Sequence, residues 1–314
     1  MITATSPRAV RGATSPAASS GIPLPADALP VRERRYYTPP PRPLASCERK
    51  RSGEAPYGLS TQTACRNLIV LTAGHSGLGL SVMTAMLAWE LSVRGRRCAL
   101  VDADFVGGCL DVLLGMENEP GLRFSQVDAP LGHLDGAALN HELIAWEGVR
   151  VLPYDPWNAK QPEWWEVQAA LRALAQVNDV VLVDAGQGGL IETVTDLREG
   201  LHIVATELSV LGLARTKAHR ARLVSWECST PHIVGIEPRG APRGRGTVTI
   251  AEAQDYLTTS LFGPIKPSVG LCGDVLEGLG IRSIAKGSRK TIAMLADLVD
   301  TTLSGSEKDT SVSG

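Results

Sequence analysis

From Asn67 onward, short apolar runs alternate with segments of helical length, and this alternation constrains the fold more than any other feature. The run from Val180 to Asp184 is apolar at every position but the last, which is typical of a strand buried on both faces of a parallel sheet. The pattern predicts strands at 68–72, 98–102, 149–153, 180–184, 202–206, 232–236 and 265–269, and helices at 81–94, 162–176, 208–226, 250–257 and 288–303. We therefore expect a doubly wound α/β fold with a mainly parallel sheet flanked by helices.

The first 66 residues differ from the rest in composition. They hold ten of the twenty prolines and no sustained hydrophobic period, so they cannot bury enough apolar surface to offset the entropy of ordering. We predict a disordered arm at 1–66, an α/β domain at 67–303 and a disordered polar tail at 304–314. The basic, proline-rich stretch 32–41 within the arm is compatible with a partner-docking motif and with a plain solvated tail.

The net charge of −2 conceals an asymmetry between the arm and the body of the chain. Ten basic and four acidic residues precede position 67, while 21 basic and 29 acidic residues follow, so nonspecific DNA binding by the body is disfavoured. No run reaches the roughly 20 apolar residues of a transmembrane segment. The six cysteines include no C-x-x-C pair, so neither a zinc site nor a disulfide framework is predicted. We expect a cytoplasmic protein with reduced thiols.

A glycine-rich turn at 74–81 lies between the first predicted strand and the first helix. In a phosphate-binding loop of the pattern G-x-x-x-x-G-K-[ST], the glycines let successive N–H groups point at one anion. Gly74 and Gly79 match the glycines and Ser81 matches the hydroxyl that holds magnesium, but Leu80 stands at the lysine position. Close packing of the helix on the sheet, without any ligand, also explains such a turn.

The missing lysine bears on binding and catalysis to different degrees. A charge-assisted contact to phosphate is typically worth about 1.5–3 kcal/mol, so its loss weakens binding without abolishing it. Hydrolysis suffers more, because charge develops on the transferred phosphoryl group in the transition state and Leu80 cannot stabilise it.

Three further segments carry a family likeness. Residues 100–104 read L-V-D-A-D, residues 107–115 read G-G-C-L-D-V-L-L-G with P-G-L at 120–122, and residues 179–186 read D-V-V-L-V-D-A-G. With the glycine-rich turn, they resemble the MinD/ParA family of P-loop ATPases, which has a deviant Walker A motif. Within that family the chain looks most like the CpaE/TadZ-like proteins of Flp/Tad pilus localisation and the actinobacterial septum-site-determining proteins.

The resemblance implies ATP and Mg²⁺ as ligands. It implies that Ser81 and Asp184 hold magnesium, Asp184 through water, and that Asp104 is the switch aspartate that positions the attacking water. A strand-end or helix-capping role is the structural alternative for Asp184. The full set of residues expected around the nucleotide is Gly74, His75, Ser76, Gly77, Leu78, Gly79, Leu80, Ser81, Asp102, Asp184 and Glu237.

The chain departs from the family pattern at several of these positions. His75 replaces the lysine that reaches across a nucleotide-sandwich dimer, and Glu237 follows the strand where many relatives hold an asparagine against adenine. The resemblance with these losses implies a pseudo-ATPase or very weak ATPase that forms a homodimer and positions a Flp/Tad pilus, a secretion machine or the division septum. Recruitment to a pole, the septum or the inner face of the membrane would follow. An active ParA/MinD-type ATPase of chromosome partitioning or cell division is the alternative.

Three other features each allow two interpretations. The basic residues at 215–222 form either a DNA-contacting helix face or a plain solvated face. Arg239, Arg243 and Arg245 form a flexible basic loop, or one of them contacts phosphate in place of the lost lysine. The last helix at 288–303 is amphipathic with acidic residues on its polar face, so we expect it to close the domain and not to grip a membrane.

Overall fold

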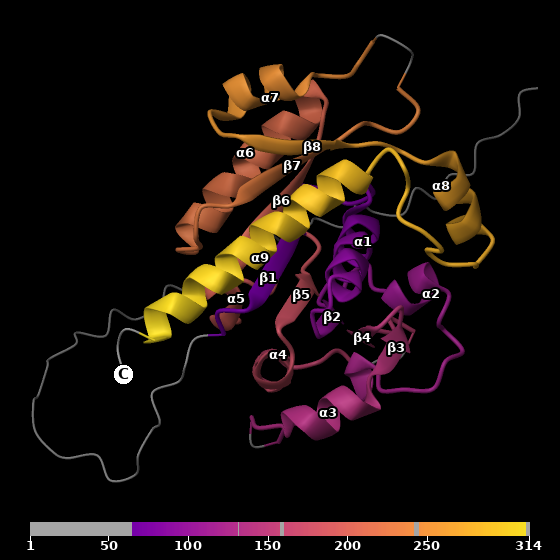
Figure 1. The fold of residues 1–314 in the computed structure, drawn as a ribbon, viewed down its shortest axis with the longest axis vertical. Coiled ribbons are helices and arrows are strands. Elements are labelled where there is room, and N and C mark those ends of the chain that lie inside the picture. The colour runs from indigo at the N-terminus through magenta and orange to yellow at the C-terminus, as the bar shows by residue number, and fades with distance from the viewer. Residues whose placement is uncertain (1–64, 131, 158–159, 242–244, 312–314) are drawn as a thin grey trace, which may run out of the picture. The chain divides into compact units, whose positions relative to one another are not determined.

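The computed structural model describes residues 65–130, 132–157, 160–241 and 245–311, so the predicted arm lies almost entirely outside the described residues. An eight-stranded sheet has the order β3-β4-β2-β5-β1-β6-β7-β8 (Figure 1). The strands are β1 (Leu68–Ala73), β2 (Cys98–Asp102), β3 (Ile144–Trp146), β4 (Val149–Leu152), β5 (Val180–Asp184), β6 (Leu201–Glu207), β7 (His232–Ile236) and β8 (Leu261–Ile265). Every neighbouring pair is parallel except β3 with β4, which confirms the predicted doubly wound, mainly parallel sheet.

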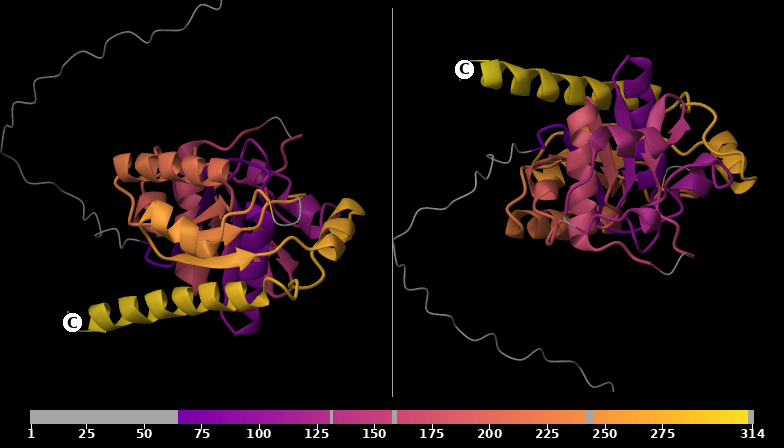
Figure 2. Two further views of the ribbon diagram at one scale, coloured as in Figure 1. Left: turned by 90° about the horizontal axis from the view of Figure 1, so that it is seen from above. Right: turned by 90° about the horizontal axis from the view of Figure 1, so that it is seen from below.

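Helices cover both faces of this sheet. Alternate residues of β1 point to opposite faces, so Ile69 packs with α1 and α9 while Val70 packs with α4, α6 and α7. Figure 2 shows α6 and α9 on opposite sides of the strands. The helices are α1 (Leu80–Val93), α2 (Leu110–Leu114), α3 (Gly136–Glu142), α4 (Trp164–Val177), α5 (Asp196–Glu199), α6 (Val210–Ser225), α7 (Ile250–Leu257), α8 (Val269–Leu276) and α9 (Arg289–Ser311), with a 3-10 turn at Phe124–Gln126.

The last predicted strand is displaced in the structure. We expected it at 265–269, but β8 ends at Ile265 and α8 begins at Val269. Pro267 cannot donate a ladder hydrogen bond, and the Ser268 hydroxyl accepts the Leu271 N–H at 3.3 Å and caps the new helix.

The last helix is longer than expected. Helix α9 continues to Ser311, whereas we predicted a helix that ends at Leu303 and a disordered tail from Ser304. The hydroxyls of Thr301, Thr302 and Ser304 each donate to a carbonyl four residues earlier, at 2.7, 2.9 and 2.8 Å, and thereby occupy these backbone acceptors. Residues 312–314 lie outside the described residues.

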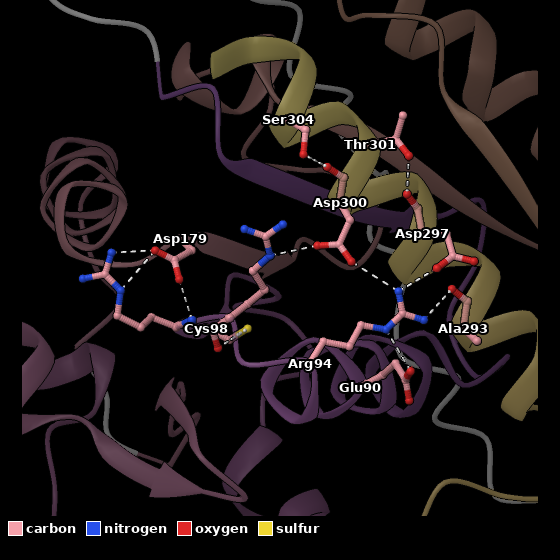
Figure 3. A network of polar contacts seen from close by, with 11 residues as sticks. Glu90, Arg94, Cys98, Asp179, Ala293, Asp297, Asp300, Thr301 and Ser304 are labelled. Carbon is pink, nitrogen blue, oxygen red and sulfur yellow. Dashed lines mark hydrogen bonds and ion pairs between the residues drawn. The ribbon is translucent and has the colours of Figure 1, made fainter. Parts of the chain in front are cut away.

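An ion-pair network joins α9 to the end of α1, as expected for a helix that closes the domain (Figure 3). The Arg94 guanidinium donates to Asp297 at 2.7 Å, to Glu90 at 3.0 Å and to the Ala293 carbonyl at 3.1 Å. Asp300 accepts from Arg94 at 3.2 Å and from a neighbouring arginine at 2.8 Å. The acidic face of α9 therefore lies against arginines of the protein itself. Among the helices of the described chain, none is both long enough and apolar enough to cross a bilayer.

Candidate functional site

The glycine-rich turn leaves β1 at the carboxyl edge of the sheet and enters α1 at Leu80. Strand β1 lies between β5 and β6, and the chain moves to opposite sides of β1 before and after β5, so this edge is a topological switch point. The backbone N–H groups from His75 to Ser81 donate to no acceptor in the described part of the chain. These free donors at the start of a 14-residue helix form an anion-binding geometry.

A cavity of about 410 Å³ opens above this turn. Its floor consists of the turn and the first residues of α1, and its sides come from the ends of β2 and β5, from α2 and from the loop after β7. The lining residues are Ala73, His75, Ser76, Gly77, Leu78, Gly79, Leu80, Ser81, Val82, Asp104, Gly108, Cys109, Val112, Leu113, Asp184, Gly186, Gln187, Arg239 and Val275.

One group of lining residues, which we call the acidic wall, consists of Asp104, Asp184 and Ser81. Asp184 ends β5 and is only 2% exposed, and this burial raises the pKa of its carboxyl to about 6. Hydrogen bonds from the Ser81 side chain and from the Gly186 N–H at 3.2 Å lower the pKa part of the way, while the charge of Asp104 raises it. The wall thus presents a hydroxyl and carboxylate oxygens, which are the ligands that Mg²⁺ prefers.

Asp102 supports this wall from behind. It pairs in register with Asp184 across β2 and β5, and its carboxylate accepts the N–H groups of Asp104 and Leu110, both at 3.2 Å. Burial and the nearby charge of Asp184 hold the pKa of Asp102 well above its usual range. Asp102 therefore fixes the start of the loop after β2 and does not line the cavity.

Asp104 also organises this loop. Its carboxylate accepts the N–H groups of Val106 at 3.3 Å and Gly107 at 3.2 Å. The side chain lies so close to Gly186 that a Cβ at that position would be 2.5 Å from Cγ of Asp104. The two ends of β2 and β5 are therefore in contact through this side chain.

A second group of lining residues, which we call the cationic wall, consists of His75, Leu80 and Arg239. Leu80 is only 8% exposed and belongs to the hydrophobic core around α1 and α9. His75 Nδ1 lies 2.9 Å from the Ser76 carbonyl oxygen, so Nδ1 carries the proton, and the buried Nε2 has no hydrogen-bond partner among the described residues. Arg239 reaches the turn from the loop after β7, and its Nη2 would lie 3.3 Å from a Cβ at Gly79.

The structure brings together most of the residues predicted around the nucleotide. The residues from His75 to Ser81, Asp104 and Asp184 line the cavity, whereas Gly74, Asp102 and Glu237 do not. A Cβ at Gly74 would lie 3.0 Å from the backbone oxygen of Arg215, so this glycine permits α6 to approach β1. The Glu237 N–H donates to the Ile265 carbonyl at 2.9 Å, and its carboxylate lies 3.7 Å from Lys266 Nζ.

Some cavity residues were missed because their signals are weak. Cys109 lies within the segment 107–115 and Gln187 directly follows the segment 179–186, but neither was predicted to contact the nucleotide. Val275 belongs to α8, which the sequence did not predict, so no pattern indicated that it reaches the turn.

A second, mostly apolar cavity of about 540 Å³ adjoins the first. The two cavities share Leu78, Gly79, Val82, Leu113, Arg239 and Val275. The other lining residues of the second cavity come mainly from the ends of β7 and β8 and from α8. A ligand with phosphates and a flat apolar group could therefore occupy both cavities at once.

The basic residues of α6 do not form one continuous solvated face. His219 is fully buried, and its Nε2 lies 2.8 Å from the Thr72 hydroxyl while Arg222 donates to Nδ1 at 2.9 Å. Burial and then the charge of Arg222 lower the pKa of His219 to about 4, so its ring is neutral at pH 7. Lys217 lies 5.4 Å from the ring centre of Tyr256, and Arg220 donates to the Leu257 carbonyl at 2.7 Å. Arg243 of the basic loop lies outside the described residues.

The donor set bears on which ions the site can hold. Among the described residues there is no group of three or more His, Cys, Asp or Glu side chains that could hold a metal by itself. A magnesium ion at Ser81 and Asp184 would therefore complete its shell with water and phosphate oxygens, as is usual for this ion. The described cysteines, Cys65, Cys98, Cys109, Cys228 and Cys272, are free thiols, and Cys47 lies outside the described residues.

Comparison with known sequences gives partial matches. Residues 64–134 match the ParA family model described as NUBPL iron-transfer P-loop NTPase. A putative septum site-determining protein MinD of Tupiella akineta is 28% identical over 162 residues, which cover 48% of this chain and 50% of the relative. MinD of Thermotoga maritima is 28% identical over 127 residues, which cover 39% and 45%. The chain thus spans about half the length of these curated relatives.

Solved structures share the fold over most of the chain. A ParA family ATPase from Chlorobium tepidum TLS has a TM-score of 0.62 at 19% identity, with 74% of this chain and 98% of that protein covered. MinD from Pyrococcus horikoshii OT3, solved with Mg-ADP, has a TM-score of 0.57 at 22% identity, with 75% and 96% covered. At these identities the structural likeness shows the fold. The sequence matches show that the chain is similar to ParA/MinD-type P-loop NTPases.

Proposed function

We propose that this chain is a ParA/MinD-type localisation factor that binds a nucleotide with Mg²⁺ weakly and hydrolyses it very slowly or not at all. The observation that carries the proposal is the contrast around one turn. The turn with its free backbone donors lines the same cavity as Ser81 and Asp184, while Leu80 is buried in the core. The chain would position a Flp/Tad pilus, a secretion machine or the division septum.

The residues present fit a magnesium nucleotide. The free N–H groups of the turn would hold phosphate oxygens, Ser81 and Asp184 would hold the ion, and the adjoining apolar cavity would take the base. Bound Mg²⁺ neutralises phosphate charge. Leu80 cannot supply the positive charge that the P-loop lysine provides within the turn, so weaker stabilisation of a transferring phosphoryl group is expected.

Exposed apolar side chains on segments that line the cavity suggest a surface that binds another protein. We propose that the partner is a second copy of this chain. Val106 is 94% exposed, Val269 is 91% exposed and Leu276 is 82% exposed. These residues belong to the loop after β2 and to α8, two segments that also contribute cavity residues (Figure 1). Large exposed apolar side chains that lie together are typical of surfaces that another protein covers.

The test is a titration of the full-length chain with ATP and Mg²⁺ that follows binding by calorimetry and mass by light scattering. We expect Mg²⁺-dependent binding, an increase in mass and no turnover above background. Asp184→Ala should remove the Mg²⁺ dependence. Asp179→Ala is the matched control, because Asp179 precedes the other end of β5 and pairs with Arg97.

Two outcomes would contradict the proposal. Absence of nucleotide binding would remove its basis. Magnesium-dependent turnover that Asp184→Ala abolishes would instead favour an active ParA/MinD-type ATPase, for which the approach of Arg239 to the turn is the supporting observation. The position of a fluorescent fusion in cells would separate a role at the pilus from one at the septum.

A further inference from the structure

Among the described residues, the one arginine that lines the cavity comes from outside the glycine-rich turn. Arg239 lies three residues after the end of β7 and lines both adjoining cavities. Its Nη2 would lie 3.3 Å from a Cβ added at Gly79. Gly79 caps the N-terminus of α1, so the guanidinium is adjacent to the free N–H groups of the turn.

The Arg239 guanidinium is also available to bind a ligand. It makes no hydrogen bond or ion pair with any residue that the structure describes. The neighbouring carboxylate of Glu237 lies 3.7 Å from Lys266, which draws it toward β8. An unpaired guanidinium beside an anion-binding turn is suited to a phosphate, because its planar fork can donate two parallel hydrogen bonds to phosphate oxygens.

We propose that Arg239 makes the contact to the terminal phosphates of a nucleoside diphosphate or triphosphate that Leu80 cannot make. In a P-loop the lysine at the position of Leu80 reaches the β- and γ-phosphates, so a substitute cation should act on the same groups. The site should therefore bind di- and triphosphates more tightly than monophosphates. This inference rests on the proposed nucleotide binding and identifies the residue that sets its selectivity.

The experiment measures Mg²⁺-dependent binding of AMP, ADP and ATP to the full-length chain and its variants. Arg239→Ala should weaken ADP and ATP binding about 10- to 100-fold and leave AMP binding nearly unchanged, because a charged hydrogen bond to the terminal phosphates is lost. Arg245→Ala is the matched control: Arg245 is an exposed arginine of the same loop and lines neither cavity. Both variants should unfold at the same temperature as the wild type.

A restored lysine gives an independent readout. Leu80→Lys should make Arg239 largely redundant, so Arg239→Ala in that background should weaken ATP binding by less than about threefold. If Arg239→Ala matches Arg245→Ala while the wild type binds ATP, the inference is wrong and the proposed function stands. If neither the wild type nor Leu80→Lys binds any of the three nucleotides, the proposed function itself fails.

Discussion

The acidic wall and the cationic wall of the cavity differ in how the chain builds them. Asp184 ends a buried strand, and Asp102 behind it is paired with it in register, so the sheet itself positions the acidic wall. The cationic wall has a buried leucine at the expected lysine position and receives its arginine from a loop after β7. The positions of Asp102 and Asp184 are fixed by the pairing of their strands in the sheet. A loop, by contrast, can bring a charged side chain to a place where the turn itself has none.

The two walls also differ in how their charged groups affect the stability of the folded state. A buried carboxylate with a raised pKa destabilises the folded state at neutral pH, because its charge loses solvation. Arg239 on the other wall is exposed and carries no such penalty. Buried ionisable groups with a shifted pKa are common at ligand-binding sites.

The largest effect is expected for Asp184→Asn without nucleotide or Mg²⁺. The folded pKa of about 6 lies above the unfolded value near 3.9, so the folded state binds more protons between these values and wild-type stability falls as pH rises through about 6. The amide avoids this penalty. The variant should be more stable by up to about 3 kcal/mol at pH 8, and the difference should vanish near pH 4, as measured by denaturant unfolding.

Asp179→Asn provides a control of opposite sign. A hydrogen bond from Arg97 lowers the pKa of Asp179, so this carboxylate stabilises the fold at neutral pH and the contribution is lost as pH falls through the lowered pKa. The variant should therefore be less stable than wild type at pH 8. A loss of stability in Asp184→Asn at pH 8 would show that the buried carboxylate is compensated and that the acidic wall carries no cost.

Gly186→Ala tests the contact between the ends of β2 and β5. Gly186 has φ 53°, and a Cβ there would lie 2.5 Å from Cγ and 2.9 Å from Cβ of Asp104, so the whole side chain must move. We expect a loss of about 2 kcal/mol and weaker Mg²⁺-dependent binding. Gly189→Ala in the same loop meets no atom within 4 Å and should change neither quantity. Equal effects of the two variants would mean that Asp104 adapts freely.

Gly79→Ala applies the same change to the cationic wall. Gly79 has φ 95°, but a Cβ there would meet only the end of the Arg239 side chain at 3.3 Å, which can move aside. The expected loss is about 1 kcal/mol of stability from the backbone, with weaker binding of ADP and ATP because Arg239 is displaced. Gly95→Ala shares a positive φ of 86° and meets no atom within 4 Å, so it should lose stability alone. Unchanged binding in Gly79→Ala would separate Arg239 from the phosphate site.

The sequence was informative where burial decides the structure. The bounds predicted for β2, β5, β7 and α7 agree with the structure, because strands covered on both faces have continuous apolar runs that end at a polar residue. The short antiparallel strand β3 was missed, since three residues give no period. Helix α8 was missed because its apolar residues include none that is buried, which contradicts the assumption that apolar runs indicate the core.

Some residues of the site could likewise be predicted from the local sequence, and others could not. The residues from His75 to Ser81 form one continuous turn after a predicted strand, and Asp184 ends another predicted strand. The local sequence pattern was therefore enough to place them at the same edge of the sheet. The surroundings of Glu237 and Arg239 depend on β7 and β8 pairing so that Ile236 lies beside Ile265. That register turns Glu237 toward Lys266, and no local pattern contains this information.

The smallest effect is expected for Arg94→Ala, because Arg94 follows the end of α1 that is opposite to the glycine-rich turn. Figure 3 shows its contacts. Arg94 binds Glu90, Asp297 and the Ala293 carbonyl, yet its side chain is 26% exposed and that of Asp297 is 69% exposed. Solvent-exposed ion pairs contribute little, so we expect a loss below about 1 kcal/mol, reduced further by salt, and unchanged nucleotide binding. Arg282→Ala, at an exposed arginine that makes no hydrogen bond or ion pair with the described residues, should change neither quantity. A loss above about 2 kcal/mol for Arg94→Ala, or altered nucleotide binding, would mean that the packing of α9 on α1 governs the turn at the other end of α1. The properties of the two walls would then depend on contacts far from the cavity.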